Sequence, residues 1–249
     1  MPEELDVGCI SYRGMERSAI VLYDLAAYFL PLYGLSYGDF FTYYPVLGFV
    51  SALISQAEAD LEADLAAYPH WQRAWAGKKQ RILSLLVEQQ LHDPHIDTHL
   101  QEVEGYFALI HKLLGLGLVA HDDVMRAAEL RLADFRVLHT ILARMRKAPY
   151  PERLFDVLQP LGVWAELRGY IAEYADDVAA NRHNTYRLLV RLYGKQAPRH
   201  MQAEMTRYWE LYDQRLAQCP EAEQAMLQEM VARYQQDYPL APIPAPILE

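Results

Sequence analysis

A group of polar residues interrupts the apolar stripe of a helix that we predict over residues 161–181. The helical period connects Tyr174 to Asp177 and Asn181, and the stripe becomes apolar again at Leu188. Asp177 and Asn181 are about one turn apart, so both side chains can reach one point above the helix. Oxygen ligands at this spacing, without cysteine or a pair of histidines, favour a hard cation such as Mg²⁺. The pattern therefore indicates a magnesium site that completes its shell with water and phosphate oxygens.

The neighbouring residues leave two interpretations of this polar group open. Glu173 and Asp176 flank the stripe and offer further carboxylates to a metal ion. Arg182 and Arg187 follow within the next turns and offer the polar group a partner inside the protein. In the first case the residues form a ligand site, and in the second they form a polar network between helices.

A second predicted helix, over residues 45–67, changes from apolar to acidic along one face. Its stripe runs from Val46 to Ala57 and then reaches Asp60 and Asp64. These carboxylates lie at the negative end of the helix dipole, and burying two of them together is costly without a cation. We therefore expect Asp60 and Asp64 to bind a cation. The alternative is a solvated helix end, in which the helix leaves the core near Ala57. The same period places two further acids to the side of the stripe, namely Glu58 and Glu62.

One arginine lies on the inward stripe of a helix that we predict over residues 121–147. The stripe passes from Val124 through Arg131 to Phe135. An inward arginine needs an anion, and its planar guanidinium suits the oxygens of phosphate. Arg131 is therefore a candidate phosphate ligand. A buried bridge to a carboxylate, of which Asp134 is the nearest in the chain, is the alternative.

The elements that must position these side chains are helices throughout. Val, Ile and Thr never cluster in alternating runs, so we predict no strand. The helical period and the prolines predict helices over residues 14–30, 45–67, 71–92, 95–115, 121–147, 151–159, 161–181, 182–194, 198–217 and 220–237. So many helices without a long linker predict an all-α fold, a single-domain antiparallel helical bundle over residues 1–238. Residues 239–249 contain four prolines and should form an extended tail.

Composition narrows the classes of function that the bundle can have. The formal net charge of -10 argues against binding to nucleic acid, because phosphate contacts need a basic face. The two cysteines lie far apart in the chain and predict neither a disulfide framework nor a zinc site. No uninterrupted apolar run is long enough for a transmembrane helix, and the first residues do not read as a signal peptide. We therefore expect a cytoplasmic protein without a transmembrane segment.

Two acidic helices and an inward arginine in an all-helical chain resemble the class I isoprenoid synthases, which include trans-prenyl diphosphate synthases, squalene and phytoene synthases and terpene cyclases. The segment from Asp60 to Asp64 is similar to the first aspartate-rich motif of that family. Asp177, Asn181 and Thr185 are similar to the second metal motif of the cyclases, although Thr185 stands where the family has an acid. The resemblance implies that the two motifs face each other across a central cavity and hold Mg²⁺.

The resemblance also implies a reaction, the magnesium-dependent ionisation of an allylic prenyl diphosphate by a terpene synthase or prenyltransferase. The implied metal ligands are Asp60, Asp64, Asp176, Asp177 and Asn181. Arg131 would sense the diphosphate, and Arg233 with Tyr234 resembles the arginine–tyrosine pair that closes over it. Aromatic walls would shelter the carbocation, and the candidates are Tyr43, Phe49, Tyr106, Phe135 and Tyr174. The implied partner is a prenyl diphosphate, and relatives of this fold often form homodimers.

The pattern favours one of three other classes of function and argues against two. A non-catalytic helical protein of the same fold, which binds a partner or a lipid, is favoured by Thr185 and by the divergent first motif. A carboxylate-bridged di-metal protein needs Glu-x-x-His on two helices. No glutamate stands three positions before any of the histidines that would be used, namely His92, His95, His99, His111, His121 and His139. A membrane-surface role does not suit the mixed, acidic helix faces.

Overall fold

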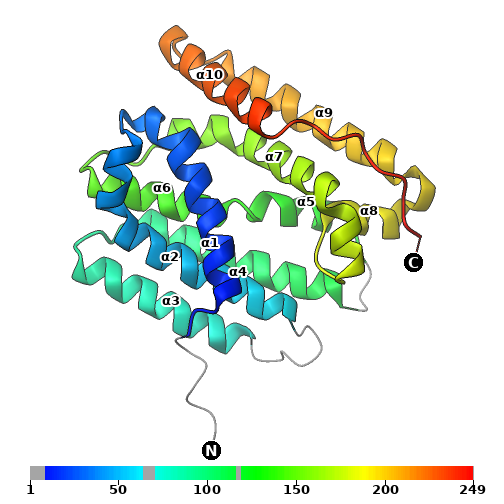
Figure 1. The fold of residues 1–249 in the computed structure, drawn as a ribbon, viewed down its shortest axis with the longest axis horizontal. Coiled ribbons are helices and arrows are strands. Elements are labelled where there is room, and N and C mark those ends of the chain that lie inside the picture. The colour runs from blue at the N-terminus through cyan, green and yellow to red at the C-terminus, as the bar shows by residue number, and fades with distance from the viewer. Residues whose placement is uncertain (1–8, 64–70, 116–118, 249) are drawn as a thin grey trace, which may run out of the picture. The chain divides into compact units, whose positions relative to one another are not determined.

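The computed structural model describes residues 9–63, 71–115 and 119–248, and within these ranges the chain forms helices and no strand (Figure 1). The predicted all-α class is therefore confirmed. The chain groups into two compact units. The first unit contains residues 1–107 and 133–151, and the second contains residues 108–132 and 152–249. The single domain predicted over residues 1–238 stays a prediction.

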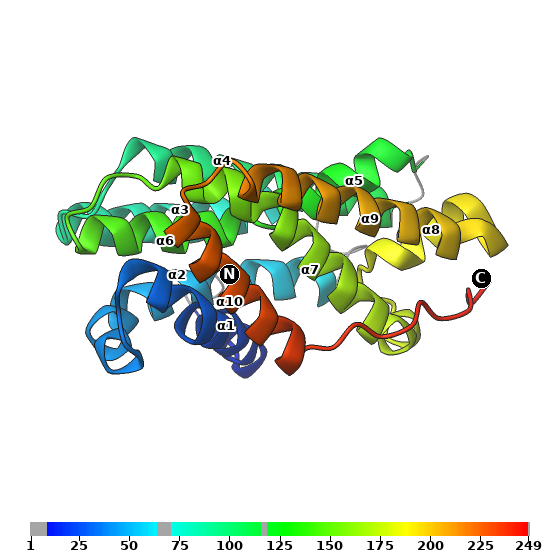
Figure 2. The ribbon, with the colours of Figure 1, turned by 90° about the horizontal axis from the view of Figure 1, so that it is seen from above.

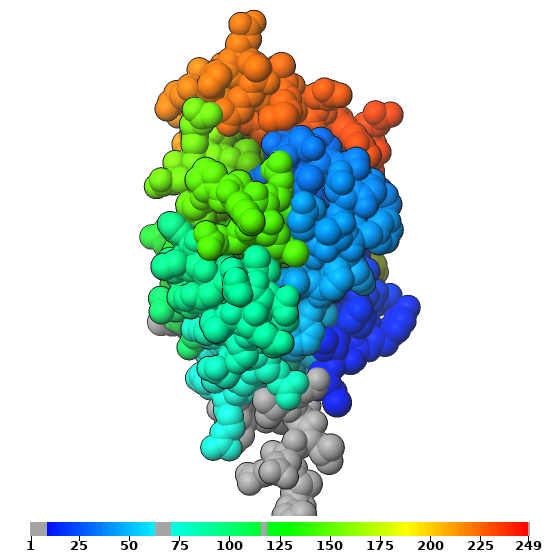
Figure 3. All heavy atoms as spheres, turned by 90° about the vertical axis from the view of Figure 1, so that its left-hand side faces the viewer, coloured from blue at the N-terminus to red at the C-terminus, as the bar shows by residue number. Residues whose placement is uncertain are grey.

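The first unit is built around one long helix. Its helices are α1 (Tyr12–Asp24), the π-helix η1 (Leu25–Phe29), the 3₁₀ turn η2 (Leu30–Tyr33), α2 (Tyr37–Ala63), α3 (Trp71–Glu88), most of α4 (Pro94–Leu114) and α6 (Ala133–Met145). α2 packs against α1, α3 and α6. The space-filling view shows no hollow where the first half of α2 meets α6 (Figure 3).

A glycine lets α1 approach α2 closely. Ser11 caps α1 by accepting a hydrogen bond from the Gly14 amide over 3.1 Å. The Ser11 amide and hydroxyl both donate to Oε1 of Gln56 on α2, over 2.6 and 2.7 Å. A Cβ atom at Gly14 would lie 2.5 Å from that oxygen. The absence of a side chain at residue 14 therefore permits the contact between the two helices.

The second unit is organised around α7. It contains α5 (His121–Leu130), α7 (Glu152–Ala179), α8 (Thr185–Tyr193), the 3₁₀ turn η3 (Gly194–Gln196), α9 (Ala197–Leu216) and α10 (Glu221–Asp237). α7 packs against α5, α8 and α9, and α8 packs against α5 and α9. After α10 the chain runs as an extended tail through residue 248, as predicted (Figure 2).

Two predicted helices, over residues 151–159 and 161–181, are one continuous helix, so the predicted break at Pro160 is wrong. Proline cannot donate to the carbonyl four residues earlier, which here belongs to Asp156. That carbonyl accepts a hydrogen bond from the Arg215 guanidinium of α9 instead. The side chain of another helix thus satisfies the group that Pro160 leaves without its helical donor, and α7 continues.

Other predicted helix boundaries are also wrong. The helix predicted over residues 121–147 is two helices that belong to different units, α5 and α6, with a turn at residues 131–132. The helix predicted to start at residue 45 starts at Tyr37 and contains Pro45. The helix predicted over residues 182–194 starts at Thr185.

One helix among the described residues is long and apolar enough to cross a membrane by length and composition. The most apolar window of this stretch, Tyr37–Glu62, has a mean hydropathy of 1.2, but 61% of that window is buried inside the protein. A mostly buried core helix passes the same test. The predicted lack of a transmembrane segment therefore stays a prediction.

Candidate functional site

The joint between α7 and α8 gathers the polar residues that interrupt the predicted stripe. Asp177 is 3% exposed, and it is the one fully buried carboxylate among the described residues. Its Oδ1 accepts a hydrogen bond from Nε of Arg182 over 2.8 Å. Its Oδ2 accepts one from Nδ2 of Asn184, also over 2.8 Å. The charge of Asp177 is thus compensated by a guanidinium whose side chain is 35% exposed.

Asn181 ends α7 rather than continuing its face. α7 ends at Ala179, and Asn181 has a left-handed backbone with φ of 52°. The Asn181 amide donates to the carbonyl of Val178, and the Arg182 amide donates to that of Asp177. This pair of bonds is a Schellman motif, in which asparagine is one of the few residues tolerated at the left-handed position. The prediction that Asp177 and Asn181 share one helical face is therefore wrong.

Hydrogen bonds from α8 close the joint. Asn184 is the N-cap of α8, and its Oδ1 accepts from the Arg187 amide over 3.1 Å. Its Nδ2 also donates to the Tyr170 carbonyl over 2.8 Å. The Arg187 guanidinium donates to Oδ1 of Asn181 over 2.8 Å and to the Arg182 carbonyl over 3.2 Å. The structure thus contains the hydrogen bonds to Arg182 and Arg187 that the network interpretation predicts.

The joint also holds a buried hydroxyl with unused hydrogen-bonding capacity. Thr185 is the first residue of α8 and is fully buried. Its Oγ1 has no hydrogen-bond partner among the described residues. Asp176, the neighbour of Asp177 on α7, is exposed. Glu173 is also exposed. The side chains at the joint are thus a buried acid, two arginines that reach the surface and a buried hydroxyl.

In the first unit Asp60 lies beside a buried lysine that the sequence did not point to. Nζ of Lys78 on α3 donates to Oδ2 of Asp60 over 2.9 Å, and the lysine side chain is only 1% exposed. The neighbours Ala59 and Leu61 are 4% and 2% exposed. The alternative in which the helix leaves the core near Ala57 is therefore wrong. Asp64 lies outside the described residues.

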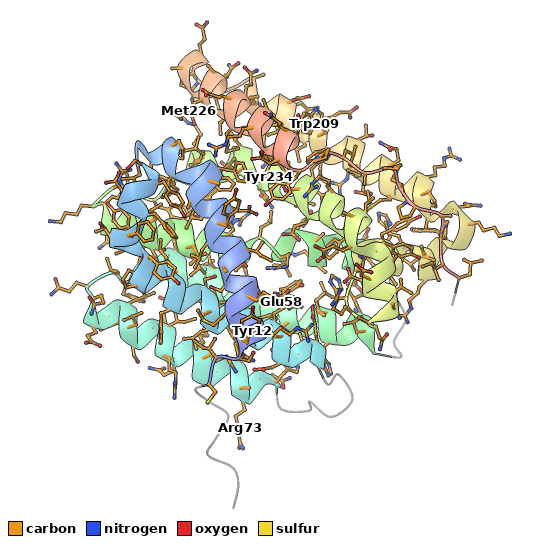
Figure 4. All side chains as sticks on the ribbon, in the orientation of Figure 1. Tyr12, Glu58, Arg73, Trp209, Met226 and Tyr234 are labelled. Atoms are coloured by element: carbon orange, nitrogen blue, oxygen red, sulfur yellow. The ribbon has the colours of Figure 1, made fainter. Side chains whose placement is uncertain are left out.

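The two acids beside the predicted stripe join α2 to α1. Glu62 forms ion pairs with Arg17 and with Arg13, the latter over 3.1 Å. Glu58, which Figure 4 labels, lies 3.6 Å from Arg17 and accepts a hydrogen bond from the Tyr106 hydroxyl over 3.2 Å. Burial raises the pKa of the Glu62 carboxyl, the nearby charge of Glu58 raises it further, and Arg17 opposes both. Sequence reasoning missed this cluster, although the four-residue spacing of Arg13 and Arg17 puts both on one face of α1.

The predicted diphosphate-binding side chains belong to the second unit. Arg131 caps the end of α5 by donating its amide to the Ala127 carbonyl over 3.0 Å, and its side chain is half-buried. It therefore does not lie on a continuous helix stripe. Arg233 is exposed on α10. Its neighbour Tyr234 (Figure 4) contacts Arg168 of α7, whose guanidinium carbon lies 5.4 Å from the ring centre.

The five predicted aromatic walls divide between the units. Tyr43, Phe49, Tyr106 and Phe135 belong to the first unit, and Tyr174 belongs to the second. Tyr106 is buried, Phe49 is exposed, and Phe135 packs edge-on against Phe29 with ring centres 4.6 Å apart. The first unit has a small pocket with a volume of about 10 Å³. Its lining residues are Ala57, Leu61, Trp71, Ala74, Trp75 and Phe107, so none of the predicted walls contributes to it.

The donor sets differ in how well they fit a magnesium ion. Asp177 is the better candidate of the two aspartates, because the side chain of its cationic partner Arg182 is 35% exposed, whereas the cationic partner of Asp60 is buried. Asp60 does not fit, because its loss to a metal would leave the buried charge of Lys78 without compensation. Asn181 does not fit either, since its exposed side chain binds Arg187 at the end of a helix. In the described part of the chain, no group of three or more His, Cys, Asp or Glu residues could hold a metal ion.

Comparisons with known proteins add no assignment. No family model matches the chain, and neither the curated proteins nor the solved structures contain a significant match.

Proposed function

We propose that the α7–α8 joint binds a diphosphate and that the chain is a magnesium-dependent enzyme of the class I isoprenoid synthase type, which ionises an allylic prenyl diphosphate. One observation carries the proposal. Asp177 is a buried carboxylate near the end of α7, and the guanidinium of Arg182, which compensates its charge, reaches solvent. A buried acid with a displaceable cation, next to a second arginine, suits a ligand that brings both a metal ion and an anion.

The chemistry follows from the groups at the joint. Asp177 would hold Mg²⁺ together with water and diphosphate oxygens, and the ion would neutralise charge on the leaving diphosphate. Arg182 and Arg187 can turn their planar forks towards diphosphate oxygens. The Thr185 hydroxyl, buried without a partner among the described residues, can donate to the same anion. Stabilising the departing diphosphate lowers the barrier to breaking the allylic carbon–oxygen bond.

The remaining predicted residues belong to the same proposal. Tyr174 would offer an aromatic face to the carbocation, and Arg131 would add positive charge on the side of the diphosphate. The isoprenoid synthase-type bundle, the central cavity, a cytoplasmic location and a homodimer are parts of the proposal that rest on the sequence. The proposed ligand set in the first unit is reduced to Asp64, because Asp60 compensates Lys78.

A specific observation favours the second candidate, a non-catalytic helical protein that binds a partner or a lipid. Asp60 has an internal cationic partner, and Asn181 holds a helix end. Two of the proposed metal ligands thus have structural roles within their own units. In this candidate Asp177 has a structural role as well, and the acids stabilise the helix contacts without binding a metal.

Magnesium and pyrophosphate distinguish the two candidates. For the enzyme, pyrophosphate with Mg²⁺ should raise the melting temperature by about 5 °C at a hundredfold excess over its Kd. Prenyl diphosphates of several chain lengths should release pyrophosphate. Asp177→Asn should abolish both effects, whereas Glu152→Gln, an exposed control on the same helix, should retain both. If pyrophosphate leaves the wild-type melting temperature unchanged and no prenyl diphosphate is cleaved, the second candidate holds.

A further inference from the structure

The C-terminal tail is held on the second unit through its backbone. The Tyr186 hydroxyl donates to the carbonyl of Pro244 over 2.6 Å. The Tyr174 hydroxyl accepts a hydrogen bond from the Ile247 amide over 2.8 Å and donates to the carbonyl of the same residue over 3.4 Å. Two side chains on the body of the unit thus bind three backbone groups of the tail. Figure 2 shows the tail following the unit beyond the end of α10.

The two tyrosines form one recognition surface on adjacent helices. Tyr174 comes from α7 and Tyr186 from α8, and their ring centres are 4.7 Å apart at an angle of 62°. Both side chains are at most 1% exposed, so each hydroxyl needs a partner at this depth. Burial raises the pKa of Tyr186 to about 12, and the neighbouring Tyr174 contributes to this shift. The Tyr186 hydroxyl therefore remains a donor at neutral pH, and the tail provides its acceptor.

The chemistry of the tail matches these hydroxyls. Three prolines at alternate positions, Pro242, Pro244 and Pro246, have no amide hydrogen and favour an extended chain. Such a chain presents carbonyl oxygens to donors and loses little conformational entropy when it docks. The side chains of Ile247 and Leu248 are 44% and 57% exposed. The contact thus recognises an extended backbone more than a particular side chain.

We infer that the surface around Tyr174 and Tyr186 is a binding site for extended, proline-containing peptide segments, and that the chain's own tail is a resident ligand that excludes such a segment of another protein. A short connection runs from Tyr238, at the end of α10, to the first anchored residue. A short linker gives an effective concentration in the millimolar range, so the tail excludes weaker ligands until it is released. This binding site shares Tyr174 with the proposed enzyme, but it uses the hydroxyl of Tyr174, whereas the proposed enzyme uses the aromatic face of Tyr174 and the charged groups of the joint.

The test uses the complete chain with a protease recognition sequence inserted between Tyr238 and Pro239. Cleavage keeps every residue in the sample, but the tail is no longer tethered and so loses its high effective concentration at the binding site. A fluorescent peptide of residues 239–249 should then bind the cleaved protein, with anisotropy as the readout, and should not bind the uncleaved protein at the same concentration. Tyr174→Phe and Tyr186→Phe should each weaken binding about fivefold through the loss of hydrogen bonds. The exposed control Tyr12→Phe should leave it unchanged.

Competition identifies the class of ligand. An unlabelled peptide with prolines at the same alternate positions, but with serine in place of isoleucine and leucine, should displace the fluorescent peptide. A glycine–serine peptide of equal length should not. The inference is overturned if the cleaved protein fails to bind the tail peptide, if both tyrosine variants bind as wild type does, or if the second proline-containing peptide does not compete. Pyrophosphate binding is measured separately, so failure of one proposal leaves the other standing.

Discussion

Nζ of Lys78 lies 2.9 Å from Oδ2 of Asp60, and this contact joins α3 to α2 inside the first unit. The lysine is 1% exposed, whereas the carboxylate is 21% exposed. The pair therefore explains an acid on an inward stripe without a metal ion. It also makes the lysine, rather than the aspartate, the residue that depends on its partner.

Asp60→Asn should lower the free energy of unfolding by about 3 kcal/mol, because a buried ammonium would lose its compensating charge. Urea titration measures this change. Adding Lys78→Met to Asp60→Asn should recover most of the loss, since an apolar side chain of similar length fills the same space. The exposed control Glu88→Gln should change stability by less than about 0.5 kcal/mol. If Asp60→Asn alone proved as stable as the wild type, this role of the pair would be contradicted.

Gly14→Ala should destabilise the protein by about 2 kcal/mol, because its Cβ would displace Oε1 of Gln56, 2.5 Å away, from its hydrogen bonds with Ser11 and would crowd the Gln56 Cα at 3.3 Å. Gly169→Ala provides a matched control inside α7, where a Cβ meets nothing within 4 Å. That substitution should stabilise the protein by about 0.5 to 1 kcal/mol through helix propensity. Thermal unfolding of both variants should show shifts of opposite sign, and shifts of the same sign would argue against the close approach.

Asn184→Ala should cost about 2 to 3 kcal/mol, because it removes the cap of α8 and leaves Asp177 with one donor fewer. Asn181→Gly should keep the stability within about 0.5 kcal/mol, since glycine adopts the left-handed backbone at little cost. Chemical denaturation measures the free energy of unfolding of both variants. If Asn181 serves as a metal ligand, Asn181→Gly should instead abolish the stabilisation by magnesium and pyrophosphate while the fold survives.

His139 should make the first unit sensitive to acid. Burial lowers the pKa of its imidazole from 6.5 to about 3, and its Nδ1 lies 2.6 Å from the Tyr33 hydroxyl. The folded state thus binds fewer protons than the unfolded state between these values. The contribution of neutral His139 to the free energy of unfolding is therefore fully present above pH 6.5. It is lost as the pH falls, at a slope of up to about 1.4 kcal/mol per pH unit.

His139→Gln keeps a hydrogen-bond acceptor for Tyr33 and removes the titration. Between pH 6.5 and 5, before most carboxyls titrate, the wild type should lose stability relative to this variant. Urea titrations at several pH values measure the difference. Equal slopes for the two proteins would show that His139 does not determine the acid sensitivity.

Helix type and approximate location were predictable because helical periodicity is a local property. The side chains that repeat every three to four residues must face one interior, wherever the partner helix comes from. The predicted helix boundary at Pro160 was wrong because a residue distant in the chain donates the hydrogen bond that the proline cannot donate. Pro160 reads as a helix break, and only the Arg215 guanidinium, which satisfies the Asp156 carbonyl, makes the continuous helix acceptable. Asn181 fits the helical period, yet its left-handed backbone ends the helix.

The sequence by itself determined that the chain is helical, that Asp60 and Asp177 interrupt apolar faces, and that the end of the chain is extended. Only the tertiary structure decided what each of these features contacts. Lys78 is 18 positions from Asp60, and Ile247 is 73 positions from Tyr174. A buried charge or hydroxyl needs a partner, so the sequence predicts that a partner exists. Which partner satisfies it depends on how distant helices pack, and helical periodicity carries no information about that packing.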